Sequence, residues 1–209
     1  MYSYFYWSYF GGMIKNFIFD MGGVLIEWSP IEFIKRLGVN DKDIDLIYES
    51  TVKKPYWHEY DLGQINKEEL YQKCLNHLPV RLHKIAKEFI GNWSSVSKEI
   101  EGMNEYCLSL KQKGYKLYML TNAGKNQVYY IRNYPYKYFD GKCVSAHYGV
   151  GKPDKEFYEI LLKKYNLNRD ECIFVDDVLE NVLGAEKIGI KAIQFKSVEQ
   201  LRKEVSKLL

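Results

Sequence analysis

The chain has 209 residues and a formal net charge of +3, with acidic and basic side chains interspersed along its length. This length suits one well-buried domain with an insertion or a lid, and the mixed charge argues against a nucleic-acid-binding stripe or a polybasic membrane patch. The four cysteines are far apart and include no Cys-x-x-Cys pair, which is typical of reduced thiols in a cytoplasmic protein rather than of a disulfide framework or a zinc site.

The first twelve residues, MYSYFYWSYFGG, are rich in aromatic side chains and contain no Lys or Arg. A signal peptide needs a basic start and a longer apolar centre, and a membrane span needs about 20 apolar residues. We therefore expect residues 1–12 to be a disordered or non-native leader and the domain to begin near Met13. A partner-binding or interfacial tail is the alternative, because aromatic side chains favour such places.

The stretch from Asn16 to Ile26 reads NFIFDMGGVLI. An apolar, strand-forming run ends at Asp20, and a Gly-Gly pair follows at once. A buried parallel strand presents a single acidic group in this way at the carboxyl edge of a sheet, where ligands bind in open α/β folds. An Asp that merely begins a turn before Gly is the alternative at this position.

Residues 29–94 have a helical pattern. Ser29-Pro30 predicts a helix start with Ser29 as the N-cap. Apolar residues then recur at helical spacing, and glycines and prolines, Pro55 among them, punctuate the pattern. The helical segments are 31–37, 41–52, 66–78 and 81–90. We expect four or five helices with little core of their own, inserted into an α/β core made of residues 13–28 and 95–209.

From residue 98 onward, helical and strand patterns alternate. Strands are predicted at 115–120, 142–145, 172–175 and 190–195, and the helices between them include one at 126–134. Such alternation predicts a doubly wound parallel sheet with helices on both faces and right-handed connections. Polar residues follow the strands or lie in the adjacent loops at four places: Asp20, Thr121-Asn122, Lys152 and Asp176-Asp177.

Each of these polar groups could by itself cap a helix or face solvent. Because the ends of parallel strands share one edge of the sheet, all four groups can instead converge on one site. Carboxylates suit Mg²⁺, which takes oxygen ligands, and a lysine with a hydroxyl near a helix N-terminus suits phosphate oxygens. A carboxylate facing both can attack phosphorus and form an aspartyl-phosphate that water then hydrolyses.

These motifs resemble those of the haloacid dehalogenase superfamily of phosphohydrolases, whose core is Rossmann-like. The four matching stretches are Asp20-Met21-Gly22-Gly23-Val24, Leu120-Thr121-Asn122, Lys152-Pro153-Asp154, and Asp176-Asp177 with Asn181. The helical insertion lies where that family's C1-type cap belongs. Together with residues 57–65 in the cap, the first motif resembles the branch that includes glucose-1-phosphate phosphatase and the N-terminal phosphatase of soluble epoxide hydrolase.

The resemblance implies a Mg²⁺-dependent phosphomonoester hydrolase that acts on a small phosphorylated metabolite, with a sugar phosphate as the expected substrate. It implies no nucleic-acid or membrane partner and a monomer or homodimer. The implied roles are a nucleophile and metal ligand at Asp20, a metal-binding carbonyl at Gly22, phosphate binding at Thr121 and Asn122, charge neutralisation at Lys152, metal binding at Asp176 and Asp177, and support of this loop by Asn181.

One position departs from the family pattern. Most phosphatases of the superfamily carry a second Asp two residues after the nucleophile, where it acts as the general acid, and this chain has Gly22 there. General acid catalysis is typically worth about 10²–10⁴-fold in rate. We expect the loss to be tolerated because the substrate has a good leaving group. Alternatively, Glu27, His58 or Glu59 supplies the proton.

Other readings of the same motifs are a haloalkanoate dehalogenase, a phosphomutase and a phosphate-binding protein that has lost catalysis along with the general acid. A dehalogenase needs no metal, and the adjacent carboxylates of Asp176 and Asp177 argue against it because they are costly without a cation. A receiver domain carries its acidic pair first in the chain, whereas the pair comes last here.

Overall fold

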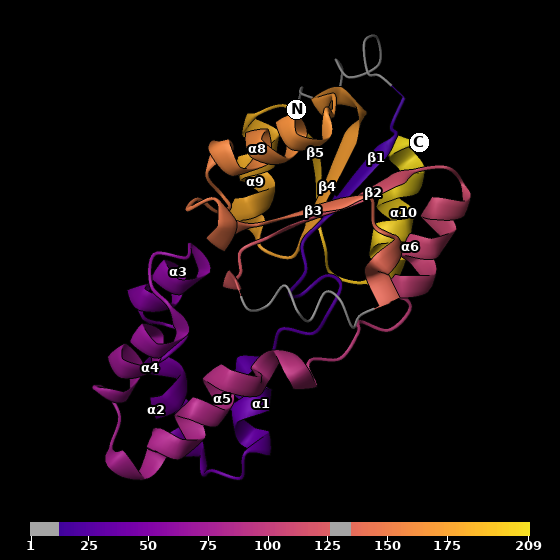
Figure 1. The fold of residues 1–209 in the computed structure, drawn as a ribbon. Coiled ribbons are helices and arrows are strands. Elements are labelled where there is room, and N and C mark those ends of the chain that lie inside the picture. Colours follow the sequence, from indigo (N-terminus) through magenta and orange to yellow (C-terminus); the bar gives the residue numbers. More distant parts are fainter. Residues whose placement is uncertain (1–12, 126–134) are drawn as a thin grey trace, which may run out of the picture.

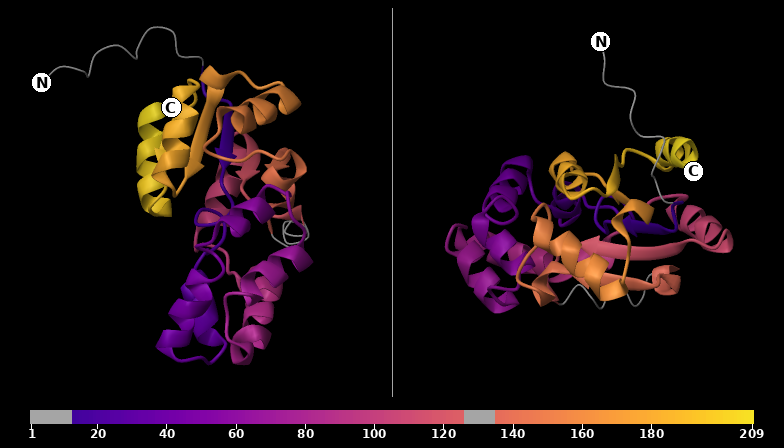
Figure 2. Two further views of the ribbon diagram at one scale, coloured as in Figure 1. Left: turned by 90° about the vertical axis from the view of Figure 1, so that its left-hand side faces the viewer. Right: turned by 90° about the horizontal axis from the view of Figure 1, so that it is seen from above.

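The computed structural model describes residues 13–125 and 135–209 (Figures 1 and 2). The predicted leader at 1–12 and the predicted helix at 126–134 lie outside the described residues. The strands form one parallel sheet in the order β3-β2-β1-β4-β5. Their bounds are β1 Asn16–Phe19, β2 Lys116–Thr121, β3 Gly141–Val144, β4 Cys172–Asp176 and β5 Lys191–Gln194. The predicted parallel α/β fold is confirmed.

Helices cover both faces of this sheet (Figure 1). One face carries α6 Met103–Gln112 and α10 Val198–Leu208, and the other carries α8 Lys155–Tyr165 and α9 Leu179–Lys187. Phe17 and Phe19 of β1 pack with the first pair of helices, and Ile18 packs with the second. This is the two-residue period of a strand buried on both faces, and it explains why β1 is a continuous apolar run. Short 3₁₀ turns connect the other elements: η3 Pro135–Tyr138, η4 Ser145–His147 and η5 Arg169–Glu171.

The helical segment between β1 and β2, called the cap below, lies beyond the carboxyl ends of the strands (Figure 1). Its elements are α1 Pro30–Arg36, α2 Asp41–Glu49, α3 Pro55–Asp61, α4 Lys67–Leu75, η1 Val80–Leu82 and α5 His83–Val96. Ile34, Leu70 and Phe89 are fully buried in a hydrophobic cluster separate from those of the sheet. The expectation of little core was wrong, because each short helix turns branched or aromatic side chains toward the others.

Two details of the cap differ from the sequence-based expectation. Ser29 makes no side-chain capping bond, although Pro30 does begin α1. Helix α3 is absent from the predicted segments because Pro55 was taken as a break between helices. Pro55 instead occupies the first turn of α3, where its missing N–H leaves no hydrogen bond unmade.

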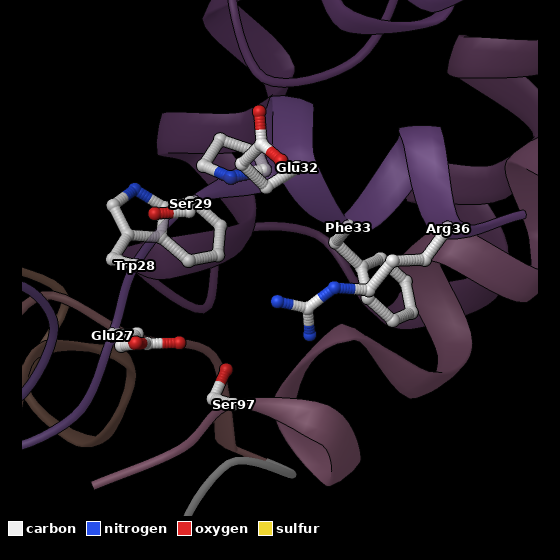
Figure 3. Close-up of a pocket in the computed structure, with 8 residues that line it drawn as sticks. Glu27, Trp28, Ser29, Glu32, Phe33, Arg36 and Ser97 are labelled. Carbon is white, nitrogen blue, oxygen red and sulfur yellow. The ribbon is translucent and has the colours of Figure 1, made fainter.

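Two chain connections join the cap to the sheet domain, and they lie side by side. The Glu27 N–H donates to the Lys98 carbonyl over 2.8 Å, and Ile26 and Glu99 form an antiparallel bridge. Figure 3 shows Glu27 from one connection and Ser97 from the other around a small hollow, into which Arg36 of α1 extends. This pairing holds the cap over the carboxyl edge of the sheet.

Within the described ranges, none of the helices combines the length and apolar composition of a membrane span. The four cysteines, Cys74, Cys107, Cys143 and Cys172, are buried and form no disulfide.

Candidate active site

Asp20 lies at the centre of the sheet's carboxyl edge. It follows β1 directly, and its N–H donates to the Val175 carbonyl of β4 over 2.9 Å, which extends the pairing of the two strands by one bond. Its side chain is buried, and Oδ1 accepts a hydrogen bond from the Met21 N–H over 2.6 Å. The strand geometry therefore fixes the carboxylate at the point where β1 and β4 end.

Lys152 connects this carboxylate to β4. Its Nζ lies 2.8 Å from Asp20 Oδ1 and 2.6 Å from Asp176 Oδ2, and only 2% of the residue is exposed. Asn122 holds the lysine's backbone, accepting from its N–H and donating to its carbonyl, each over 2.8 Å. Burial lowers the pKa of Lys152, but the charges of the two carboxylates outweigh burial and raise it, so the side chain stays cationic.

Asp20, Asp176 and Asp177 form a compact acidic cluster. One carboxylate oxygen from each lies within 4.8 Å of the others. Asp176 Oδ1 accepts from the Val178 N–H over 2.9 Å and from the Asn181 amide over 3.0 Å. Three carboxylates against one lysine leave excess negative charge, and all the donors are hard oxygens. This donor set fits Mg²⁺, the predicted cofactor.

Burial is the main reason that two carboxyl groups of the cluster have raised pKa values. It raises the pKa of Asp20 to about 7, although Lys152 opposes this shift and the charges of Asp176 and Asp177 add to it. Burial and the charge of Asp176 also raise the pKa of Asp177. Bringing a cation to these groups favours their charged forms.

Metal-free protein is therefore expected to lose stability as the pH rises from about 4 to about 7. The pKa of Asp20 is 3.8 ordinarily and about 7 in the fold, so in this window the unfolded chain releases a proton that the folded chain keeps, and deprotonation favours unfolding. Mg²⁺ binds the deprotonated carboxylates, so its addition should raise the melting temperature more at pH 7.5 than at pH 5.5. The measurement is thermal melting in EDTA and in Mg²⁺ at both pH values. Asp45→Asn, at an exposed residue of α2, should behave as wild type, and equal Mg²⁺ effects at both pH values would contradict the prediction.

A cavity of about 240 Å³ opens in front of the cluster. Asp176, fully buried, lies behind the cavity wall and reaches the site through Lys152 and Asn181. All the other residues predicted for the site line the cavity: Asp20, Gly22, Thr121, Asn122, Lys152, Asp177 and Asn181. The structure thus brings together side chains from the ends of β1, β2 and β4 and from the loop before α8.

Residues on the cap side close the cavity, and sequence reasoning missed all of them except Trp57, which lies in the stretch 56–60 that could either line the pocket or pack inside the cap. Trp28, Val52, Trp57 and Asp61 line it. Trp57 and Asp61 both belong to α3, the helix absent from the prediction. The available signal was the cap stretch from Trp57 to Ile65, which carries part of the resemblance to the phosphatase branch.

The three predicted proton donors do not line this cavity. His58 is exposed, and Glu59 forms an ion pair with Lys73 at 3.3 Å. Glu27 borders the separate hollow between the two connections (Figure 3). The structure therefore does not favour this alternative, because sequence spacing places the three residues in or beside the cap but does not show which side of it they face.

Both glycines that follow Asp20-Met21 are closely packed by their neighbours. A Cβ at Gly22 would lie 3.3 Å from the Cβ of Trp28, so that tryptophan crowds this position. Gly23 has φ of +78°, and a Cβ there would overlap the Asp177 carboxylate. Only glycine suits a left-handed conformation at such close approach.

Comparison with known proteins gives the family. Residues 14–189 match the model of the haloacid dehalogenase-like hydrolases. The chain belongs to this family. It is 34% identical over 178 residues to the sesquiterpene phosphatase astK of Aspergillus oryzae, an alignment that covers 84% of this chain and 87% of that protein. It is 24% identical over 211 residues to the D-ribitol-5-phosphate phosphatase of Bacteroides thetaiotaomicron, with 94% and 99% covered. The predicted superfamily and enzyme class, a phosphomonoester hydrolase, are confirmed.

Solved structures agree on the fold of this haloacid dehalogenase-like hydrolase. A HAD family enzyme from Bacteroides thetaiotaomicron, a mutant in complex with magnesium and inorganic phosphate, has a TM-score of 0.70 at 21% sequence identity. The match covers 88% of this chain and 95% of that one. At this identity the likeness concerns the fold alone.

Proposed function

We propose that the protein is a Mg²⁺-dependent phosphatase that hydrolyses a small phosphate ester through an aspartyl-phosphate on Asp20. The observation that carries the proposal is the placement of the buried Asp20 carboxylate, which pairs with Lys152, forms an acidic cluster with Asp176 and Asp177, and lines a cavity beneath the cap. A nucleophile held in this way needs no rearrangement before it attacks. Catalysis of phosphoryl transfer rests mainly on such positioning and on electrostatics.

In this proposal Asp20 Oδ attacks phosphorus while Lys152 offsets negative charge on the nucleophile and the phosphoryl group. The Thr121 hydroxyl and the Asn122 backbone N–H, at the end of β2, bind the other phosphoryl oxygens. Asp20, Asp177 and the Gly22 carbonyl would hold Mg²⁺, with Asp176 binding it directly or through water, and the metal would supply positive charge to the transferring group. Asn181 holds Asp176, and the cap excludes water from the first step.

Two substrate classes fit the proposal. The resemblance favours a sugar phosphate. The cap side of the cavity favours a second candidate, the monophosphate of an apolar alcohol, because Trp28, Val52 and Trp57 line it beside the single carboxyl of Asp61 and offer buried sugar hydroxyls few partners. The sesquiterpene phosphatase relative supports the second candidate.

A panel assay tests both the activity and the substrate class. Phosphate release is measured from a chromogenic aryl phosphate, from sugar phosphates and from a series of alkyl monophosphates, each with Mg²⁺ and with EDTA. We expect Mg²⁺-dependent turnover and, for an apolar site, a rise in kcat/KM of roughly fourfold per methylene, equivalent to about 0.8 kcal/mol, until the chain outgrows the cavity.

Three outcomes of the panel count against parts of the proposal. A preference for sugar phosphates would select the first substrate class. Absence of Mg²⁺-dependent turnover on every ester would contradict the phosphatase and favour a phosphate-binding protein. Halide release from 2-haloalkanoates without metal would instead identify a dehalogenase.

A further inference from the structure

One acidic side chain of the cavity is neither the proposed nucleophile, Asp20, nor part of the acidic cluster that could hold a metal ion. Asp61, the last residue of α3, lines the same cavity as Asp20, Lys152 and Asp177. Among the described residues, the acidic cluster that could hold a metal ion consists of Asp20, Asp176 and Asp177 and does not include Asp61. Asp61 is therefore an acidic group of the cavity that neither the metal nor the phosphoryl attack already uses.

Two contacts with the sheet domain, one with the turn after β3 and one with the loop after β2, fix the position of Asp61. The Ser145 hydroxyl donates to the Asp61 backbone carbonyl, and Ser145 itself accepts from the Ala123 N–H over 2.8 Å. Tyr60, the residue before Asp61, packs against Gly124 so closely that a Cβ at Gly124 would overlap its ring. The cap residues on this side thus pack directly on the backbone of the sheet domain.

The residues after Asp61 are held in the same way. The Leu62 side chain would lie 3.2 Å from a Cβ at Gly151, the residue before Lys152. Gly63 has φ of +68°, and a Cβ there would lie 2.5 Å from the Ala146 carbonyl oxygen. Close packing of this kind holds Asp61 in the wall of the cavity instead of leaving it on a free loop.

The surroundings of Asp61 favour its neutral, proton-carrying form. Burial raises the pKa of this carboxyl well above its ordinary value, and the charge of Asp20 raises it further. The Gly124 N–H donates to the carboxyl and has the opposite effect, which is smaller than that of burial. Tyr60, the neighbouring titratable group on α3, has its pKa raised to about 12 and is neutral. A carboxylic acid near neutral pH is what general acid catalysis requires.

We propose that Asp61 is the general acid/base of this phosphatase, supplied by the cap in place of the acid missing at Gly22. The inference rests on the phosphatase function proposed above. As the bond between Asp20 Oδ and phosphorus forms, the bond from phosphorus to the ester oxygen breaks, and that oxygen takes the proton of Asp61. Water then attacks the aspartyl-phosphate and gives a proton back to Asp61, releasing phosphate and regenerating both carboxyl groups.

The test compares leaving groups in Asp61→Asn, which keeps the side chain's size but carries no acidic proton. An alkyl phosphate needs protonation of its leaving oxygen, whereas 4-nitrophenyl phosphate does not. We expect kcat/KM for the alkyl phosphate to fall roughly 10²–10⁴-fold and that for 4-nitrophenyl phosphate to fall less than about tenfold. The alkaline decline of the wild-type pH profile for the alkyl phosphate should disappear. Glu59→Gln, on the same helix but outside the cavity, should match wild type.

Other results of this comparison would contradict either the role of Asp61 or the phosphatase function. Equal losses for both esters would assign Asp61 a structural role, and no loss for either would remove it from the mechanism. A wild-type protein that releases no phosphate would instead refute the proposed phosphatase function itself. Thermal melting accompanies the assay. If Asp61→Asn melts below the assay temperature, Asp61→Ser takes its place in the same comparison.

Discussion

Asp20→Asn is expected to abolish phosphate release while making the metal-free protein more stable. Asn keeps the shape of Asp but cannot form the acyl-phosphate, and loss of a nucleophile lowers turnover by roughly 10⁴–10⁶-fold. The charged carboxylate is costly in the fold, because burial raises the pKa of Asp20 to about 7. Above that pH a neutral amide removes this cost, and Lys152 keeps its ion pair with Asp176 at 2.6 Å.

The opposite signs of these two effects make the prediction specific. Phosphate release is measured with Mg²⁺, and melting temperature is measured in EDTA at a pH of about 8. Mass spectrometry of acid-quenched wild-type protein should find a phosphoryl adduct on the peptide that contains Asp20, and the variant should show none. Activity within tenfold of wild type, or a lower melting temperature in EDTA, would contradict the assigned role. Asp45→Asn serves as the matched control at an exposed carboxylate.

The sheet edge could be predicted because its signals are local. Each strand is an apolar run that ends at a polar residue, and parallel strands with intervening helices place all their carboxyl ends together. Asp20, Thr121 and Asp176 each end or follow a strand in the structure. To predict that these residues converge with Lys152, only the topology of the sheet was needed, and the alternation of helix and strand patterns indicates that topology.

The cap side could not be predicted from local signals. Helix α3 has seven residues, begins with Pro55 and buries three aromatic side chains, a composition with weak helix propensity. What places Asp61 at the site is contact with Ser145 and Gly124, residues distant in sequence. Such docking between the cap and the sheet domain is a tertiary property, and no spacing rule within the cap shows which carboxylate faces inward.

Lys152→Met is expected to have the largest effect on stability. Lys152 lies between two buried carboxylates, and Met fills similar volume without charge. Removal of one partner from a buried ionic network costs about 3–5 kcal/mol, because the remaining charges are left uncompensated. For a chain of this length the melting temperature should fall by roughly 6–20 °C in EDTA. Activity should fall by about 10²–10³-fold because a positive charge is lost where charge develops in the reaction.

Metal and pH distinguish this electrostatic loss from a packing defect. Mg²⁺ neutralises the same carboxylates, so it should raise the melting temperature of Lys152→Met more than that of wild type. Lowering the pH to about 5 should also reduce the deficit, because Lys152 opposes the raised pKa of Asp20, and without the lysine this carboxyl takes up its proton at higher pH. The exposed Lys163→Met of α8 is the control and should leave the melting temperature unchanged. A deficit that neither Mg²⁺ nor acid reduces would mean that Lys152 stabilises the site through packing rather than charge.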